Sequence, residues 1–418
     1  MNNTIVKTVP LPDKPENVPT LSLHVLAKNA ESVLPRLIHN VFPHVQQARF
    51  VLNDATDASE RVIYQSAGSY PGVELDVQHA TSATHPHFYI DDSPATYEAG
   101  RSLSGERFEG PYTDAPLLAD WSAVRNLGWD SEKEWRLFLD ADDLMQDPEK
   151  LPGLLCVLRD LGADLAASRY VFGRGPGGEP NSSSYRERLA RSTPAIRWEG
   201  RTHETLAGGL RRVLVEDCLG VTDLKDNWGR GVRVPGRCFK VLYHDARVAG
   251  WEVSARHLAY LVQECPGMMP LDWVAGDLLE AYREKCDHPE ELAWVLCLVG
   301  EMHEARENYR AAIDCYRRAI DARPSAKAAF RLCRAEFKRE HWPGCANAYQ
   351  LGLSYRDVPQ VLDDGPVYAD SSKLLVAHAL WALGKVEEAR DMARECARLF
   401  PGSAAAAELR DRICGAAG

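Results

Sequence analysis

Hydrophobic and polar positions follow two different patterns along the 418-residue chain. In the N-terminal part, short apolar runs end abruptly in polar or acidic residues, as at 21–27, 49–53 and 135–140. Such runs are typical of buried strands, and helical patterns at 33–41 and 60–67 follow the first two of them. Strands that alternate with helices at this spacing predict an α/β fold with a doubly wound, mostly parallel sheet.

From Trp251 onward the pattern changes, because strand-like runs disappear and apolar residues recur at helical spacing to the end. Small residues, an aromatic ring and a proline also recur at fixed offsets, which is the pattern of helix–turn–helix repeats of the tetratricopeptide (TPR) type. A plain helical bundle is the alternative. The recurring positions are Gly300, Ala312, Tyr316, Ala319 and Pro324, then Cys345, Tyr349 and Gly352, then Gly384, Ala389, Cys396 and Pro401.

These patterns divide the chain into three parts. We expect an extended or disordered N-terminal arm at residues 1–20, which are polar and carry four prolines. The sheet domain is predicted at 21–250 and the all-α TPR-like domain at 251–418. An acidic, aromatic-rich insert at 79–118 interrupts the sheet domain, and loops of this length are uncommon unless they are functional or disordered.

Composition narrows the class of protein. A net charge of −11 argues against a non-specific nucleic-acid binder. No apolar run approaches the ~18 residues of a membrane span, and the polar N-terminus lacks the apolar core of a signal peptide. The eleven cysteines form no CxxC pair and favour reduced, buried thiols. We therefore expect a cytoplasmic protein without a membrane partner.

The most distinctive stretch is WRLFLDADD at 135–143, an apolar run that ends in acid. In an open α/β sheet, ligands bind at the carboxyl ends of the strands, where Asp140, Ala141, Asp142 and Asp143 are expected to lie. Crowded carboxylates repel one another unless a cation holds them, and Mg²⁺ or Mn²⁺ is the natural counter-ion. By themselves the three acids are explained equally well by a solvated turn or a helix N-cap.

Five stretches of the sequence, in this order, are similar to the motifs of a known protein family: LSLHVLAKNAE (21–31), VLNDATDAS (51–59), DWSAVRN (120–126), LFLDADD (137–143) and GRTHETL (200–206). Together with the TPR-like tail they resemble the soluble, TPR-bearing subgroup of the inverting GT-A-fold glycosyltransferases of family 2. The stretches are similar to that family's VKNEE turn, its VVDTGSTDGT segment, its DFAAARN helix, its LWLDADE metal motif and its GRIHEXL segment. Ala55 replaces a family glycine, and Asn53 replaces a frequent acid. The resemblance implies a GT-A, Rossmann-like fold for the first domain.

The resemblance also implies roles for individual residues. Asp140 and Asp142 are the expected ligands of Mn²⁺ or Mg²⁺, with His244 as the third, at the end of a strand predicted at 239–243. Glu204 is the expected general base, with Asp143 as a weaker candidate. The alternatives are a surface ion pair for Arg125, a structural histidine for His244, and N-capping for the residues at the ends of the first two strands. The residues expected to bind the nucleotide sugar are Ala27, Asn29, Glu31, Asp54, Asp57, Arg125, Asp140 and Ala141.

We therefore expect a metal-dependent inverting glycosyltransferase that moves a hexose from a nucleotide sugar, first of all a UDP-sugar, to an acceptor. TPR-like repeats favour a peptide or protein side chain as acceptor, and modified DNA or a small glycan are the alternatives. A nucleotidyltransferase is disfavoured, because residues 28–31 lack its Gly-rich, Arg-containing loop. The alternative of another class is a catalytically inactive TPR-like interaction protein. Exposed apolar ends of the repeats, around 380–399, also predict a homodimer.

Overall fold

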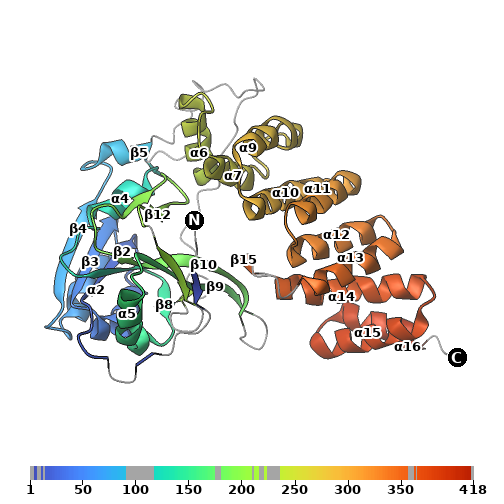
Figure 1. Ribbon diagram of the computed structural model, residues 1–418, viewed down its shortest axis with the longest axis horizontal. Coiled ribbons are helices and arrows are strands. Elements are labelled where there is room, and N and C mark those ends of the chain that lie inside the picture. The colour runs from blue at the N-terminus through green and yellow to red at the C-terminus, as the bar shows by residue number, and fades with distance from the viewer. Residues whose placement is uncertain are drawn as a thin grey trace. The chain divides into compact units, whose positions relative to one another are not determined.

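The computed structural model describes residues 4–6, 11–12, 15–90, 117–174, 180–209, 211–215, 221–223, 236–355, 362–363 and 365–415 (Figure 1). The chain forms two compact units, Met1–Val241 and Leu242–Gly418, and each is described by itself. The boundary between them falls inside helix α6 (Arg237–Val248).

The first unit is built on a mixed sheet with the strand order β1-β13-β9-β10-β7-β2-β3-β4. Neighbours along this path are parallel, except where β10 pairs with β9 and β7. The predicted α/β class with a mostly parallel sheet is therefore confirmed. The strands are β1 (Thr4–Val6), β2 (Leu21–Ala27), β3 (Gln47–Asn53), β4 (Glu74–Ala80), β7 (Trp135–Asp140), β9 (Leu165–Arg174), β10 (Pro180–Arg191) and β13 (Arg212–Val215).

Shorter elements complete the first unit. Strand β14 (Val221–Asp223) lies parallel to β9 and antiparallel to β8 (Asp143–Met145). Two small antiparallel pairs stand apart from the main sheet: β5 (Tyr89–Ile90) with β6 (Leu117–Leu118), and β11 (Arg197–Glu199) with β12 (Thr205–Ala207). The helices are α1 (Leu34–Val41), α2 (Ser59–Ala67), α4 (Trp121–Leu127) and α5 (Leu151–Asp160), with single 3₁₀ turns at Phe42–His44, Pro86–Phe88 and Pro148–Lys150.

The central strands are covered on both faces, as their continuous apolar runs predict. All seven residues of β2 are buried. One face packs in the main core with α1 and α5, through residues such as Leu23 and Leu37. The other face packs against α4 through Leu26 and Val124. Each fully buried leucine contributes about 1.5–3 kcal/mol, so the carboxyl ends of β2, β3 and β7 are fixed by a rigid sheet.

Two predicted segments fall partly outside the described residues. In the arm at 1–20, residues 4–6 form β1, which pairs with β13. In the insert at 79–118, residues 91–116 lie outside the described ranges, and the remainder forms the end of β4, a 3₁₀ turn and the β5–β6 pair.

The second unit is built from helices, and the predicted helical repeat region is confirmed (Figure 1). Consecutive helices from α10 to α16 pack against one another. A π-helical turn at Val274–Leu278 joins α8 to α9, and a short strand, β15 (Leu362–Asp363), precedes α14. The helices after α6 are α7 (Ala255–Glu264), α8 (Leu271–Trp273), α9 (Leu279–Lys285), α10 (Pro289–Glu304), α11 (Tyr309–Ala322), α12 (Ala326–Lys338), α13 (Trp342–Ser354), α14 (Gly365–Ala382), α15 (Val386–Leu399) and α16 (Ala404–Gly415).

The strand predicted at 239–243 is wrong, because these residues lie inside helix α6. Phe239, Leu242 and Ala246 are buried at helical spacing. A short, mainly apolar segment such as FKVLY does not by itself distinguish a strand from a buried part of a helix. The spacing of the buried residues beyond 243 is that of a helix.

Small residues let the repeat helices approach closely, as the recurring positions predict. A Cβ atom placed on Gly300 of α10 would lie 2.5 Å from Cε1 of Tyr316 of α11. A Cβ atom on Gly352 of α13 would lie equally close to Cε1 of Phe330 of α12. In both pairs an aromatic ring occupies the space that a side chain would otherwise fill, and this fixes how the two helices pack.

We expect Gly300→Ala to destabilise the helical unit by about 1–3 kcal/mol, because the buried Tyr316 ring must move to admit the methyl group. The measurement is hydrogen exchange of the α10 and α11 amides in the intact chain, together with its urea midpoint. Gly402→Ala is the matched control, since nothing lies within 4 Å of a Cβ atom there. Equal exchange in the two variants would contradict this packing.

Candidate active site at the carboxyl end of strand β7

A tight turn carries the predicted metal motif at the carboxyl end of β7. Asp140 is the last residue of this strand, Ala141 and Asp142 form the turn, and Asp143 begins β8. The backbone N–H of Asp140 donates to Oδ2 of Asp143 at 2.9 Å, and this bond closes the turn. Asp140 pairs in register with Leu26, so the turn lies next to the end of β2.

Asp143 holds this turn from within the core. Its carboxylate forms an ion pair with Arg188 of β10 at 3.0 Å, and the two side chains are 0% and 2% exposed. Burial raises the pKa of the Asp143 carboxyl, the Arg188 guanidinium opposes that rise, and the charge of Asp140 adds to it. A fully buried carboxylate does not contact an acceptor, so its position gives no support to Asp143 as the alternative base.

Arg188 was missed by the sequence reasoning. Strand β10 contains the polar run Arg186-Glu187-Arg188, which has none of the continuous apolar character of β2 or β7. Only the antiparallel pairing of β10 with β7 brings Arg188 beside the acidic turn.

Arg188→Leu is expected to lower the free energy of unfolding by about 3–5 kcal/mol, because the Asp143 carboxylate is left buried without its counter-charge. Hydrogen exchange of the β7 and β10 amides in the intact chain, together with its urea midpoint, measures the loss. Arg186→Leu on the same strand is the control, with an expected change of no more than about 1 kcal/mol, since Arg186 is exposed. The double variant Arg188→Leu/Asp143→Asn should regain part of the loss, and wild-type stability of the single variant would contradict the ion pair's importance.

Arg125 of α4 joins two carboxylates that are far apart in the sequence. Its Nε donates to Oε1 of Glu204 at 2.5 Å, and its Nη2 donates to Oδ1 of Asp140 at 3.3 Å. The guanidinium lies over the rings of Phe138 and Trp198, with its Cζ atom 4.0 and 5.0 Å from the ring centroids. The Arg125 side chain is 9% exposed, Glu204 13% and Asp140 25%. The cluster therefore opens to solvent mainly at Asp140.

The helix that carries Arg125 is tied to the segment that carries Glu204. Asp120 caps α4 by accepting from the backbone N–H of Ala123 at 2.8 Å. The side chain of Asn126 exchanges two hydrogen bonds with the backbone of Trp198, at 2.9 and 3.0 Å. The polar residues of DWSAVRN thus hold α4 against β11, and this places Arg125 beside Glu204.

The loops that follow β2 and β3 are joined by side-chain hydrogen bonds. Oδ1 of Asn29 accepts from the backbone N–H of Thr56 at 2.8 Å, and Oε2 of Glu31 accepts from that of Ala58 at 2.9 Å. Asp57 in turn accepts from the N–H of Glu31 at 3.0 Å. Three of the predicted nucleotide-binding residues therefore use side-chain oxygens to hold the two loops in place.

The remaining predicted nucleotide-binding residues lie in the same region. Ala27 is buried at the end of β2. Asp54 has a positive φ of 45° and accepts from the N–H of Ser82 at 3.3 Å. The phenol of Tyr89 donates to Oδ1 of Asn53 at 2.6 Å and fixes the end of β3. Burial raises the pKa of this phenol, and the charge of Asp54 adds to the rise.

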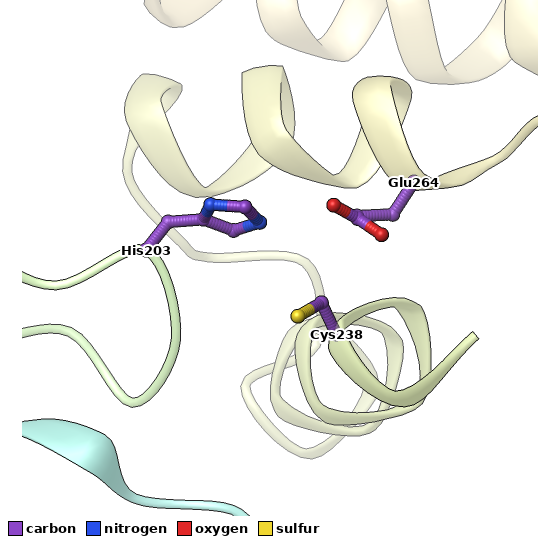
Figure 2. A group of neighbouring side chains, drawn as sticks. All are labelled: His203, Cys238 and Glu264. Carbon is purple, nitrogen blue, oxygen red and sulfur yellow. The ribbon is translucent and has the colours of Figure 1, made fainter. Parts of the chain in front are cut away.

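His244 lies on α6, in the second unit, and its side chain is 51% exposed. Its Nδ1 is 3.3 Å from Oδ1 of Asp245. Figure 2 shows another group, His203, Cys238 and Glu264. His203 precedes β12 and Cys238 lies in the first turn of α6, but Glu264 belongs to the second unit, so we assign no site to these residues.

The charged side chains in and around the acidic turn have a net charge that suits a divalent cation. Asp140, Asp142, Asp143 and Glu204 supply four carboxylates, while Arg125 and Arg188 supply two guanidinium groups, so acids exceed bases by two. Oxygen ligands are those that Mg²⁺ and Mn²⁺ prefer. Asp140 and Asp142 are only partly buried, unlike Asp143, so these are the two carboxylates of the turn that reach solvent.

A scan against protein-family models and a search of curated proteins both give no match. Among solved structures, the MamA protein shares 15% identity over 39% of this chain and 81% of its own, with a TM-score of 0.31. YrrB, described as a TPR protein with an unusual peptide-binding site, shares 14% identity over 42% and 82%, with a TM-score of 0.33. The second TPR domain of human RPAP3 shares 20% identity over 30% and 98%, with a TM-score of 0.26. TM-scores this low carry no conclusion about this chain.

None of the helices in the described ranges is both long enough and apolar enough to span a bilayer.

Proposed function

We propose that the chain is a metal-dependent inverting glycosyltransferase that moves a hexose from a nucleotide sugar to an acceptor. The observation that carries this proposal is the cluster of Asp140, Arg125 and Glu204 at the carboxyl end of β7. Three segments of the chain contribute one residue each, and they meet where an open α/β sheet binds ligands. The resemblance of the same segments to the GT-A glycosyltransferases of family 2 supports the proposal.

The residues of the cluster suit the chemistry of direct displacement. A divalent ion held by Asp140 and Asp142 would supply positive charge for the diphosphate of the donor. Glu204 takes the proton of the acceptor hydroxyl while the acceptor oxygen bonds to the anomeric carbon of the sugar. In the same step, the bond between the anomeric carbon and the phosphate oxygen of the donor breaks. Arg125 orients Glu204, since its Nε donates to that carboxylate. Asp143 is a positioning residue, because it is buried and closes the turn.

The proposed acceptor is a peptide or protein side chain, because stacked helical repeats offer an extended surface suited to another chain. Modified DNA and a small glycan are the alternatives, and the net charge of −11 disfavours DNA. The donor proposed first is a UDP-sugar, and Mn²⁺ or Mg²⁺ is the proposed cofactor. We also propose that the protein forms a homodimer through its helical repeats and that it is cytoplasmic.

The deciding experiment mixes the intact protein with UDP-, GDP- and TDP-sugars, with and without Mn²⁺, and follows nucleotide release and thermal shift. Metal-dependent release from one donor is the expected result, and it would identify the sugar as well. If no donor binds under any condition, the enzyme proposal is overturned. The alternative, a catalytically inactive TPR-like interaction protein, would then be preferred.

A further inference from the structure

A buried histidine lies behind the proposed active site. His24 is the fourth residue of β2, is 4% exposed, and its ring centroid is 5.1 Å from that of Trp129. His24 and the residues around it line a small cavity, and the volume open to the centre of a water molecule is about 10 Å³. Arg125 and Arg49 line the same cavity. The guanidinium that pairs with Asp140 and Glu204 therefore shares a cavity with a buried imidazole.

Polar atoms of these three side chains are buried without a hydrogen-bond partner among the described residues. They are Nδ1 and Nε2 of His24, Nη1 of Arg125 and Nε of Arg49. Burial and, second, the charge of Arg136 lower the pKa of His24 to about 3, so the ring is neutral at physiological pH. The Gly128 carbonyl opposes this fall, but no hydrogen bond of good geometry joins it to the ring.

The hydrogen-bonding capacities of these groups are complementary. A guanidinium only donates, whereas a neutral imidazole offers one donor and one acceptor nitrogen. A water molecule can accept from Arg125 and donate to His24 at the same time. A buried water needs two to four polar partners and roughly 10–15 Å³ of such room. The cavity offers both, and leaving its donors unpaired would cost about 1–3 kcal/mol for each group.

We propose that one buried water molecule links His24 to Nη1 of Arg125, and that His24 thereby positions the guanidinium for the proposed reaction. Nε and Nη2 of Arg125 already contact Glu204 and Asp140. With Nη1 also held, all three nitrogens of the planar group are fixed, and the group cannot turn away from either carboxylate. The effect on catalysis rests on the proposed function, whereas the water site does not.

A high-resolution crystal structure of the intact protein tests the water site. The expected result is an ordered water within hydrogen-bond distance of His24 and Arg125. A cavity without an ordered water would overturn the proposal. This result does not depend on activity, so it decides the water site even if the protein transfers no sugar.

Two variants of His24 test its positioning role. His24→Leu removes the acceptor, and we expect kcat to fall about tenfold, equivalent to about 1.4 kcal/mol, with the KM for the donor unchanged. His24→Gln keeps an acceptor and should retain most of the wild-type kcat. Ser22→Ala is the matched control, because Ser22 is a buried polar residue of the same strand that bonds Gln47 instead. It should leave kcat unchanged.

Three results would overturn the positioning role: equal kcat losses in the leucine and glutamine variants, an equal loss in Ser22→Ala, or unchanged kcat in His24→Leu. If wild-type protein transfers no sugar from any donor, the proposed function fails instead, and the crystal structure still decides whether the water is bound.

Discussion

Asp142→Asn is expected to lower the rate of sugar transfer by about 10³-fold or more, because the substitution removes a charged ligand of the proposed metal ion. Asp142 lies in the turn after β7, next to Asp140, and is only partly buried. The loss should therefore arise without unfolding of the sheet unit. Asp143 closes the turn through its bond to the Asp140 backbone, and this bond is retained in the variant.

The measurement is Mn²⁺-dependent nucleotide release at saturating donor, together with the Mn²⁺ concentration that gives half of the maximal rate. Asp160→Asn is the matched control, since Asp160 is 71% exposed at the end of α5 and its carboxylate pairs with the neighbouring Arg159. Transfer by Asp142→Asn at the rate of this control would remove the basis for a metal site in the turn.

Glu204→Gln is expected to reduce transfer by about 10²–10⁴-fold while the nucleotide sugar still binds, because the amide cannot take the proton of the acceptor. The amide oxygen of the glutamine can still accept from Nε of Arg125, which donates to Glu204 at 2.5 Å. The local geometry should therefore survive, and the loss should appear in kcat rather than in the KM for the donor.

Glu199→Gln serves as the control for this substitution, because Glu199 is an exposed residue of the neighbouring strand β11. Donor binding by calorimetry and transfer to an acceptor should both match the wild type in this control. Loss of donor binding in Glu204→Gln would indicate that Glu204 holds the donor instead of the acceptor's proton. Unchanged turnover would exclude it as the base.

The two variants together separate the role of a proposed metal ligand from that of the proposed base, and Arg125 contacts the base and the other proposed metal ligand, Asp140. Asp140 contacts Arg125 on one side of the guanidinium and Glu204 contacts it on another. If the metal ligands and the base act in one reaction, Arg125→Lys should affect both the Mn²⁺ requirement and kcat. Lysine is a point charge and cannot reproduce two directed bonds from one planar group.

The sequence by itself determined the classes of the two units. Apolar runs such as 21–27 and 135–140 have the length of buried strands. Polar and acidic residues follow each run at its carboxyl end. The period of about 3.6 residues after Trp251 predicted helices that the structure confirms. These features depend on burial of local patterns, which a sequence records directly.

The sequence failed where a local pattern was ambiguous. Residues 239–243 were predicted as a strand and belong to α6, because a short apolar run suits either element. Strand β10 was not predicted, because its buried Arg188 is compensated by a charge on another strand rather than by neighbours in the sequence.

Only the tertiary structure decided how the acidic turn is held and which residues surround it. The antiparallel return of β10 beside β7 places Arg188 on Asp143 and buries that carboxylate. The packing of α4 on β11 brings Arg125 to Glu204, which lies 79 residues away in the sequence. The sequence could predict that carboxylates gather at a strand end. Pairwise contacts between distant segments depend on strand order and helix placement, and no local pattern records them.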